Sequence, residues 1–372
     1  MAVALEQHAS GSQVYRVTEA SFQQSNIYCE VPYCTPDSRH FVYERTNPAL
    51  EGDRCEFVVC EVGTWKTQAV ERSVGLGGCA ITRGGMFYFL RTVRGDEQAL
   101  VRLDVNTGRS EVVHTFAGQK WTWSLGTVSP DGRYYARGKR VDDKYRLFGI
   151  VLVDLRRGTM DVIDYDRYIF NAHPQFEPGE GKHIMIQHNR GGQLDETGKI
   201  IRLSGEEGTT LYLLSVPDGT RTPLQVGIPY TTGITGHQSW IGDTQEMLLS
   251  VRATGDYDVE KGNLLGVRAG EAPRVASRGY RFSHVGTSWC GGFFSCDDGR
   301  TTEVIIGSVK TGRRAVVCES KTSFSQAQNT HAHPYLTPDL KWAIFNSDRS
   351  GEPHLHAATV PEGMVEALQK EG

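Results

Sequence analysis

The sequence lacks a long hydrophobic run, a block of basic residues and a visible leader segment. No apolar run approaches the roughly 20 residues that a membrane span needs, so we expect no membrane partner. The net charge is -4 and no cluster of lysine and arginine is present, which argues against nucleic-acid binding. The N-terminal residues show no charged segment followed by an apolar one, so we expect no signal peptide and a cytoplasmic location.

Two motif types are also missing. None of the eight cysteines forms a C-x-x-C pair, which argues against a zinc ribbon or a thioredoxin-type motif. Several cysteines follow apolar residues, as Cys60 and Cys318 do, so we expect buried free thiols in a reducing compartment. A G-x-S-x-G elbow is absent, which disfavours a serine hydrolase.

Helical periodicity is nearly absent before Pro361, and a repeat takes its place. Small turns of the Ser/Thr-Pro-Asp-Gly type precede short apolar strands. These residues favour a turn because proline presets φ, the aspartate side chain hydrogen-bonds its own backbone and glycine supplies positive φ. These turns begin at Thr35, Thr82, Ser129, Glu177, Ile241, Cys290 and Thr337. A spacing of roughly 47 residues fits about seven copies, which is typical of propeller blades. We predict an all-β chain with one domain over residues 1–372, a seven-bladed β-propeller of four-stranded blades.

Three segments depart from this period. A strand near residues 12–17 is expected to close the last blade, and a short tail follows residue 361. Between Pro178 and Gly242 the repeat is too long by about 16 residues, and the excess lies around residues 188–207. Such insertions project from one face of a propeller, often over a binding site, and the alternative is a disordered tip.

The histidines follow the phase of the repeat. His333 and His173 each lie five residues before the turn proline, and His237 lies five before Gly242, the equivalent turn position. If Trp289 is the counterpart of Trp240, His284 takes the place of His331. Because the innermost strands line the central channel, equivalent positions form rings around one axis. We therefore expect His173, His237, His284, His331 and His333 to converge near one mouth of the channel.

A cluster of imidazoles is typical of a metal site, whereas each histidine alone is more simply an ordinary polar residue at a strand edge. Imidazole suits zinc, manganese, iron, nickel or copper, and a glutamine oxygen favours a harder ion such as manganese. Gln328 lies three residues before His331 and can supply that oxygen. The expected cofactor is a divalent metal ion, with manganese favoured.

One family resembles this chain. The segment over residues 328–362, QNTHAHPYLTPDLKWAIFNSDRSGEPHLHAATVPE, resembles the C-terminal signature of oligogalacturonate lyases, which act on pectate oligomers and are built on a seven-bladed propeller. The resemblance extends to Asn171-Ala172-His173-Pro174, Gly236-His237 and Ser283-His284, and so covers the chain from about residue 165 onward. The N-terminal third matches only in its blade pattern.

The resemblance implies roles for particular residues. It makes Gln328, His331, His333 and His284 the ligands of a manganese-like ion. It places His237 at the catalytic centre, and His173 and His188 near the substrate pocket. The implied activity is β-elimination from a small acidic oligosaccharide such as oligogalacturonate, in pectin degradation.

This chain departs from the family at the catalytic base. The family has an arginine just ahead of the strand where this chain reads Thr209-Thr210-Leu211-Tyr212. Arg190 and Arg202, both in the long insertion, are the arginines that can reach the site, the first as a catalytic and the second as a substrate-binding residue. Arginine is almost always protonated, so His237 is the better base on chemical grounds.

Two other classes remain open at this point. Carotenoid-cleaving oxygenases hold iron with four histidines near a propeller axis, but they use wide apolar tunnels and no glutamine. A non-enzymatic TolB-like propeller module predicts neither a metal nor histidines in phase. The sequence leaves the particular uronide, exo or endo action and the oligomeric state open.

Overall fold

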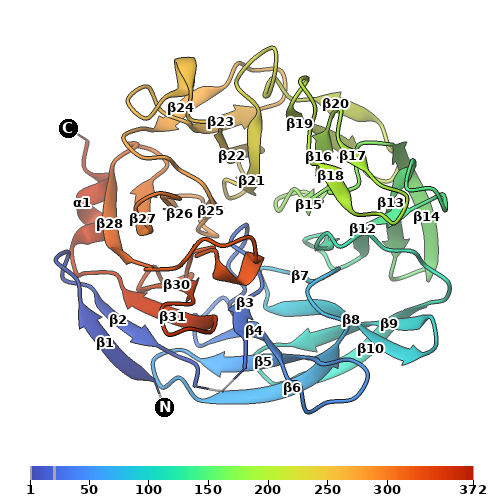
Figure 1. The fold of residues 1–372 in the computed structure, drawn as a ribbon, viewed down its shortest axis with the longest axis horizontal. Helices are drawn as coiled ribbons and strands as arrows, with labels where there is room; N and C mark the ends of the chain where they lie inside the picture. Colours follow the sequence, from blue (N-terminus) through green and yellow to red (C-terminus); the bar gives the residue numbers. More distant parts are fainter. Residues whose placement is uncertain (1, 20–21, 372) are drawn as a thin grey trace.

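The computed structural model describes residues 2–19 and 22–371. It confirms the predicted fold, a ring of seven antiparallel sheets around a central channel (Figure 1). The apolar core lies between neighbouring blades, where Tyr88 and Leu90 of one blade pack with Tyr135 and Val151 of the next. Across the described residues, no helix is both long enough and apolar enough to span a membrane.

The first three blades follow the chain without interruption, each with its innermost strand first. Blade 1 comprises β3 (Gln24–Asn26), β4 (His40–Thr46), β5 (Cys55–Glu61) and β6 (Thr67–Ser73). Blade 2 comprises β7 (Ala80–Ile81), β8 (Met86–Arg94), β9 (Glu97–Asp104) and β10 (Arg109–Phe116). Blade 3 comprises β11 (Thr127–Val128), β12 (Tyr134–Arg140), β13 (Phe148–Asp154) and β14 (Thr159–Asp166).

The next three blades repeat this order, and blade 4 carries the insertion. Blade 4 comprises β15 (Gln175–Phe176), β16 (His183–Asn189), β19 (Thr209–Ser215) and β20 (Arg221–Pro223). Blade 5 comprises β21 (Ile234–Trp240), β22 (Glu246–Val251), β23 (Leu264–Arg268) and β24 (Arg274–Ser277). Blade 6 comprises β25 (Gly286–Thr287), β26 (Phe293–Asp297), β27 (Glu303–Ser308) and β28 (Arg314–Glu319).

Blade 7 joins the two ends of the chain and has five strands rather than the expected four. It comprises β29 (Tyr335–Leu336), β30 (Trp342–Ser347), β31 (His354–Thr359), β2 (Gln13–Arg16) and β1 (Val3–Gln7). β2 lies within the predicted 12–17 segment and pairs with β31, and β1 adds an outer strand. The tail contains helix α1 (Met364–Gln369). Elsewhere, the 3-10 turn η1 (Gly255–Tyr257) lies between β22 and β23, and the 3-10 turn η2 (Gln328–Thr330) lies between β28 and β29.

Local side-chain chemistry sets the hairpins. In the turn between β9 and β10, the Asp104 carboxylate accepts the backbone N–H groups of Asn106 and Thr107. Gly108 completes the turn with φ 69°, which a residue with a Cβ rarely adopts. Residues 104–108 are therefore a strand-to-strand turn on the outer half of blade 2.

The long repeat contains an ordered hairpin rather than a disordered tip. β17 (Gln193–Leu194) pairs with β18 (Ile200–Arg202) as a separate two-stranded sheet between β16 and β19. Ile200 and Leu203 from this insertion line a pocket at the channel, so the insertion covers the face that carries the histidines.

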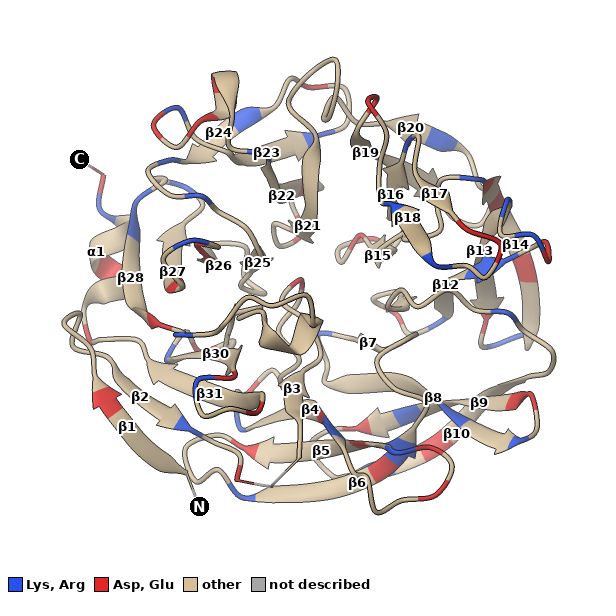
Figure 2. Ribbon diagram, viewed as in Figure 1, with Lys and Arg blue, Asp and Glu red and all other residues tan. Residues whose placement is uncertain are grey.

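The innermost strand of blade 1 is interrupted. Asn26 pairs with Tyr43, so an unbroken ladder would bring Tyr28 opposite Phe41, yet Phe41 faces Cys34. Residues 27–32 therefore leave the strand and enter the channel, and we call them the channel loop. Figure 2 shows that charged residues lie mostly on the outer strands and loops of the ring.

Candidate metal centre in the central channel

Five histidines converge as predicted from the repeat phase. His173, His237, His284, His331 and His333 all line one pocket of about 720 Å³ at the end of the channel where the innermost strands begin. His237 lies on β21, and the other four lie in the segments that lead into β15, β25 and β29. Because these strands run in one direction, their N-terminal ends meet at a single mouth.

Three of these side chains form a compact ligand group. His237, His284 and His333 each offer a ring nitrogen, and these atoms lie within 4.8 Å of one another. The ring centroids of His284 lie 4.2 Å from those of His237 and 4.3 Å from those of His333. Nε2 of His333 is buried and has no hydrogen-bond partner among the described residues. A buried, unpaired nitrogen of this kind is costly unless a ligand satisfies it.

His284 is held by a buried carboxylate. Nδ1 of His284 lies 3.0 and 2.7 Å from the two carboxylate oxygens of Asp297, which also accepts the backbone N–H of His284. A carboxylate only accepts, so Nδ1 carries the proton and Nε2 presents its lone pair. Such a carboxylate contact is the usual support of a metal-binding histidine.

His331 brings a fourth nitrogen to the cluster. Its Nε2 donates to the carbonyl oxygen of Ser325 at 2.8 Å, and its Nδ1 lies 3.2 Å from Nε2 of His284. With both rings neutral, these two facing nitrogens each present a lone pair. Two lone pairs at this distance repel each other, and a cation or a shared proton between the two nitrogens removes that repulsion. The donor set of this structure therefore fits a divalent metal ion, and imidazole nitrogens suit manganese among other ions.

Burial favours the neutral form of three of these imidazoles. Desolvation, followed by the neighbouring histidines, holds the pKa of His237 and His333 well below the usual value of 6.5. Desolvation also lowers the pKa of His331. Neutral imidazoles keep the lone pairs that metal binding or proton abstraction requires.

The backbone at two of these histidines is strained. His173 and His333 adopt φ values of 42° and 43°, in the left-handed region that side chains with a Cβ rarely occupy. Each histidine is followed by proline. The carbonyl oxygen of the residue before His173 accepts the N–H of Gln187, and that of the residue before His333 accepts the N–H of Asn346. Strain of this kind costs roughly 1–3 kcal/mol per residue and clusters at functional sites. Blades 4 and 7 thus present their histidines by the same unusual turn.

Of the remaining predicted site residues, one lines the pocket and three do not. Gln328, in η2, lines the pocket, as the expected ligand set requires. His188, Arg190 and Arg202 are not among the residues that line it. Nε2 of His188 contacts Asp166 at 3.1 Å, and Arg190 donates to the carbonyl oxygens of Glu207, Gly208 and Ile228. Arg202 donates to the carbonyl oxygen of Gly191, within the insertion.

The described residues of the pocket wall supply no permanent positive charge. Among the described residues that line it there is neither lysine nor arginine, so the family arginine has no replacement on the wall. Glu44 lines the pocket, and burial raises the pKa of its carboxyl. Trp123 also lines it with 51% of its surface exposed.

Sequence reasoning missed three residues at this site. Asp297 supports His284, Glu30 contacts Nδ1 of His173 at 3.0 Å, and the Tyr28 ring lies 4.6 Å from that of His333. Burial raises the pKa of Tyr28, so its hydroxyl keeps its proton. Only the Asp297 position had any signal, as an acidic residue within an apolar strand, and the other two come from a loop outside the repeat pattern.

Comparison with known proteins agrees with the resemblance drawn from the sequence. No family model matches the chain. An oligogalacturonate lyase of Dickeya dadantii is 39% identical over 63 residues, so the match spans only 16% of this chain and 16% of that relative.

Two solved structures share the whole fold. An oligogalacturonate lyase in complex with manganese has a TM-score of 0.76 at 17% identity, covering 98% of this chain and 97% of that one. An oligogalacturonate lyase from Vibrio parahaemolyticus has a TM-score of 0.70 at 15% identity, covering 98% of each chain. At these identities the likeness establishes the fold, and the chain is similar throughout its length to oligogalacturonate lyase propellers.

Proposed function

We propose that this protein is a metal-dependent lyase that cleaves uronic-acid-containing oligosaccharides, such as oligogalacturonates, by β-elimination. The observation that carries the proposal is the cluster of four histidines with the buried support of Asp297. The relatives named above are oligogalacturonate lyases by name, and one was solved with manganese.

His284, His331 and His333 would hold the metal, with the side-chain oxygen of Gln328 as a fourth ligand. These three imidazoles face one another, and Gln328 lies on the same pocket wall. When bound, a manganese-like ion supplies positive charge that neutralises the substrate carboxylate and stabilises the negative charge developing beside it. No lysine or arginine lines the described part of the pocket, so no side chain with a permanent charge there can replace that ion.

His237 is proposed as the base that removes the proton at C5. Its low pKa leaves the ring neutral, and a neutral imidazole nitrogen accepts a proton. The electron pair of the C5–H bond then forms the C4–C5 double bond, and the C4–O bond breaks. The ring of His237 contacts that of His284, so the proposed base lies beside a residue that would hold the metal.

The substrate is held by groups around the cluster. Trp123 offers an aromatic face, and His173, oriented by Glu30, offers a ring edge on the same pocket. His188, Arg190 and Arg202 are proposed to act from behind this wall. Arg190 and Arg202 brace the insertion through backbone carbonyls, and His188 is fixed by Asp166.

The test is an elimination assay on a panel of uronide oligomers, with purified protein and its metal content measured. We expect new ultraviolet absorbance from the conjugated product, loss of that activity with chelator, and recovery with manganese. His331→Ala and His333→Ala should lose both metal and activity, whereas His40→Ala, outside the pocket, should keep both. Activity that survives complete metal removal, or iron as the resident metal, would contradict the proposal.

We further propose that the protein works in the cytoplasm. All eight cysteines are free, and six of them are buried. Unpaired cysteines in this number are typical of a reducing compartment.

A further inference from the structure

The channel loop carries Tyr28 out of blade 1 and into the histidine cluster. The Tyr28 ring lies 4.6 Å from the ring of His333, 5.9 Å from that of His173 and 6.2 Å from that of His237. These three histidines come from blades 7, 4 and 5. Had β3 continued in register, Tyr28 would have stayed in the blade opposite Phe41.

Blades 4 and 7 hold the loop on two sides. On the side of blade 7 the anchor is Asn26, the last residue of β3 before the loop. Its side chain donates to the carbonyl oxygen of His333 and accepts from the side chain of Asn346, which in turn accepts the backbone N–H of Asn26. On blade 4, the Glu30 carboxylate forms a hydrogen bond with Nδ1 of His173. The loop is therefore tied to the same two histidines that adopt the strained backbone.

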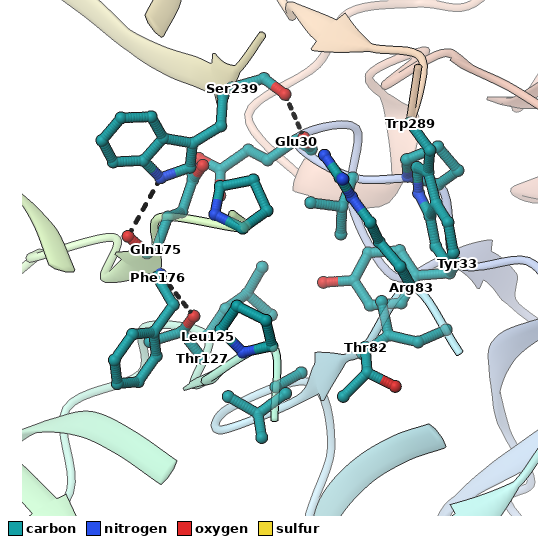
Figure 3. Close-up of a pocket in the computed structure, with 18 of the residues that line it drawn as sticks. Glu30, Tyr33, Thr82, Arg83, Leu125, Thr127, Gln175, Phe176, Ser239 and Trp289 are labelled. Atoms are coloured by element: carbon teal, nitrogen blue, oxygen red, sulfur yellow. Dashed lines mark hydrogen bonds between the residues drawn. The ribbon is translucent and has the colours of Figure 1, made fainter. Parts of the chain in front are cut away.

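Blades 5 and 6 hold it on the other sides. The Ser239 hydroxyl donates to the carbonyl oxygen of Glu30, as Figure 3 shows. A Cβ at Gly286 would collide with the carbonyl oxygen of Cys29, so glycine lets the loop pack directly on blade 6. A segment anchored to four blades holds its side chains in place before a substrate arrives, which is what catalysis requires of a proton donor.

The Tyr28 hydroxyl is free to meet a ligand. It makes no hydrogen bond with another described residue, and its oxygen is not fully buried, so a ligand can reach it. Tyr28 lines the pocket with the five histidines. Tyr33, just past the other end of the loop, lines a separate cavity of about 220 Å³, where the innermost strands end. Figure 3 shows Tyr33 there with Arg83 and Trp289.

We propose that Tyr28 is a further catalytic residue, the proton donor to the leaving oxygen of the substrate. This inference rests on the lyase function proposed above. As the base removes the C5 proton and the C4–C5 double bond forms, the C4–O bond breaks and the departing oxygen takes the proton of the Tyr28 O–H. Before the next turnover the phenolate regains a proton from the solvent, and the protonated His237 releases one to it.

The experiment compares wild type with Tyr28→Phe, which keeps the ring and removes only the hydroxyl. On an oligogalacturonate we expect kcat to fall about 100-fold or more, the usual contribution of a general acid, with KM and manganese content unchanged. On a uronide with fluoride at C4, which leaves without a proton, Tyr28→Phe should match wild type. Tyr33→Phe, the matched tyrosine outside this pocket, should match wild type on both substrates.

Every other outcome overturns either the role of Tyr28 alone or the lyase function with it. Equal loss on both substrates would make Tyr28 a structural residue, and full activity on both would remove it from the reaction. Either result overturns the role of Tyr28 while the lyase function stands. If wild-type protein forms no unsaturated product from any uronide, the lyase function itself fails, and the role of Tyr28 with it.

Discussion

Oδ2 of Asp297 lies 2.7 Å from Nδ1 of His284, and Asp297 is fully buried at the end of β26. This contact orients the imidazole so that Nε2 faces His331 across 3.2 Å. The carboxylate thus determines that Nε2 of His284 is the nitrogen available to a metal ion. Asp297 itself lies on the Nδ1 side of the ring, away from that nitrogen.

Asp297→Asn should weaken manganese binding about 10- to 100-fold, because an amide supports the ring less strongly and can stabilise the wrong tautomer. Isothermal titration of metal-free protein with manganese measures this. Asp298→Asn is the matched control, since among the described residues the Asp298 side chain accepts only backbone N–H groups, those of Arg281, Arg300 and Thr301. Equal affinity in the Asp297 variant and wild type would show that the contact has no role in metal binding.

His237→Ala separates a base from a ligand. As the proposed base, His237 should be needed for product formation, with a fall in kcat of about 100-fold or more, while one manganese per chain remains bound. Metal analysis and the ultraviolet assay on the same preparation measure both quantities. The ring nitrogen of His237 lies within 4.8 Å of those of His284 and His333, so joint loss of metal and activity would reassign it as a ligand.

Arg190→Ala tests the arginine that the sequence placed in catalysis. Its guanidinium is already bonded to the carbonyl oxygens of Glu207, Gly208 and Ile228, which joins the insertion to the neighbouring loop. We expect a lower Tm and faster proteolysis within the insertion, with kcat largely retained. A folded variant with normal Tm and a large loss of kcat would instead support direct participation in the reaction.

His356 predicts a pH dependence of stability away from the pocket. It is fully buried on β31, stacks on Phe345, and has no partner at Nε2 among the described residues. Burial lowers the pKa of His356 from 6.5 to about 3. Its contribution is fully present above pH 6.5, where the unfolded ring is also neutral, and is lost as the pH falls toward 3.

Each pH unit within that window costs about 1.4 kcal/mol of unfolding free energy per such group. His356→Phe removes the titrating ring while keeping a stacking partner for Phe345. Urea unfolding at pH 7, 5 and 4 should show a shallower loss of stability in the variant than in wild type. Parallel losses in the two proteins would mean that His356 does not set the acid limit.

Much of the fold was predictable because its signals are local. Turn chemistry at positions such as Ser129, Asp131 and Gly132 depends on neighbours in the chain, and a turn stands at the equivalent place in every blade. Counting those turns predicted the propeller and the repeat phase that brought the five histidines together. The fifth strand of blade 7 and the ordered insertion hairpin were less accessible, because both depend on pairing between segments rather than on the repeat.

The site was predictable only where it obeys the repeat. The spacing of histidines before each turn determined that one mouth of the channel carries a cluster of imidazoles, since equivalent positions in a closed ring face a common axis. Tertiary structure alone decided that Asp297 orients His284, that no arginine lines the described pocket, and that the channel loop brings Tyr28 to the rings. The Asp297–His284 contact joins two segments of blade 6, and the channel loop breaks the strand register of blade 1. Neither feature leaves a periodic trace in the chain.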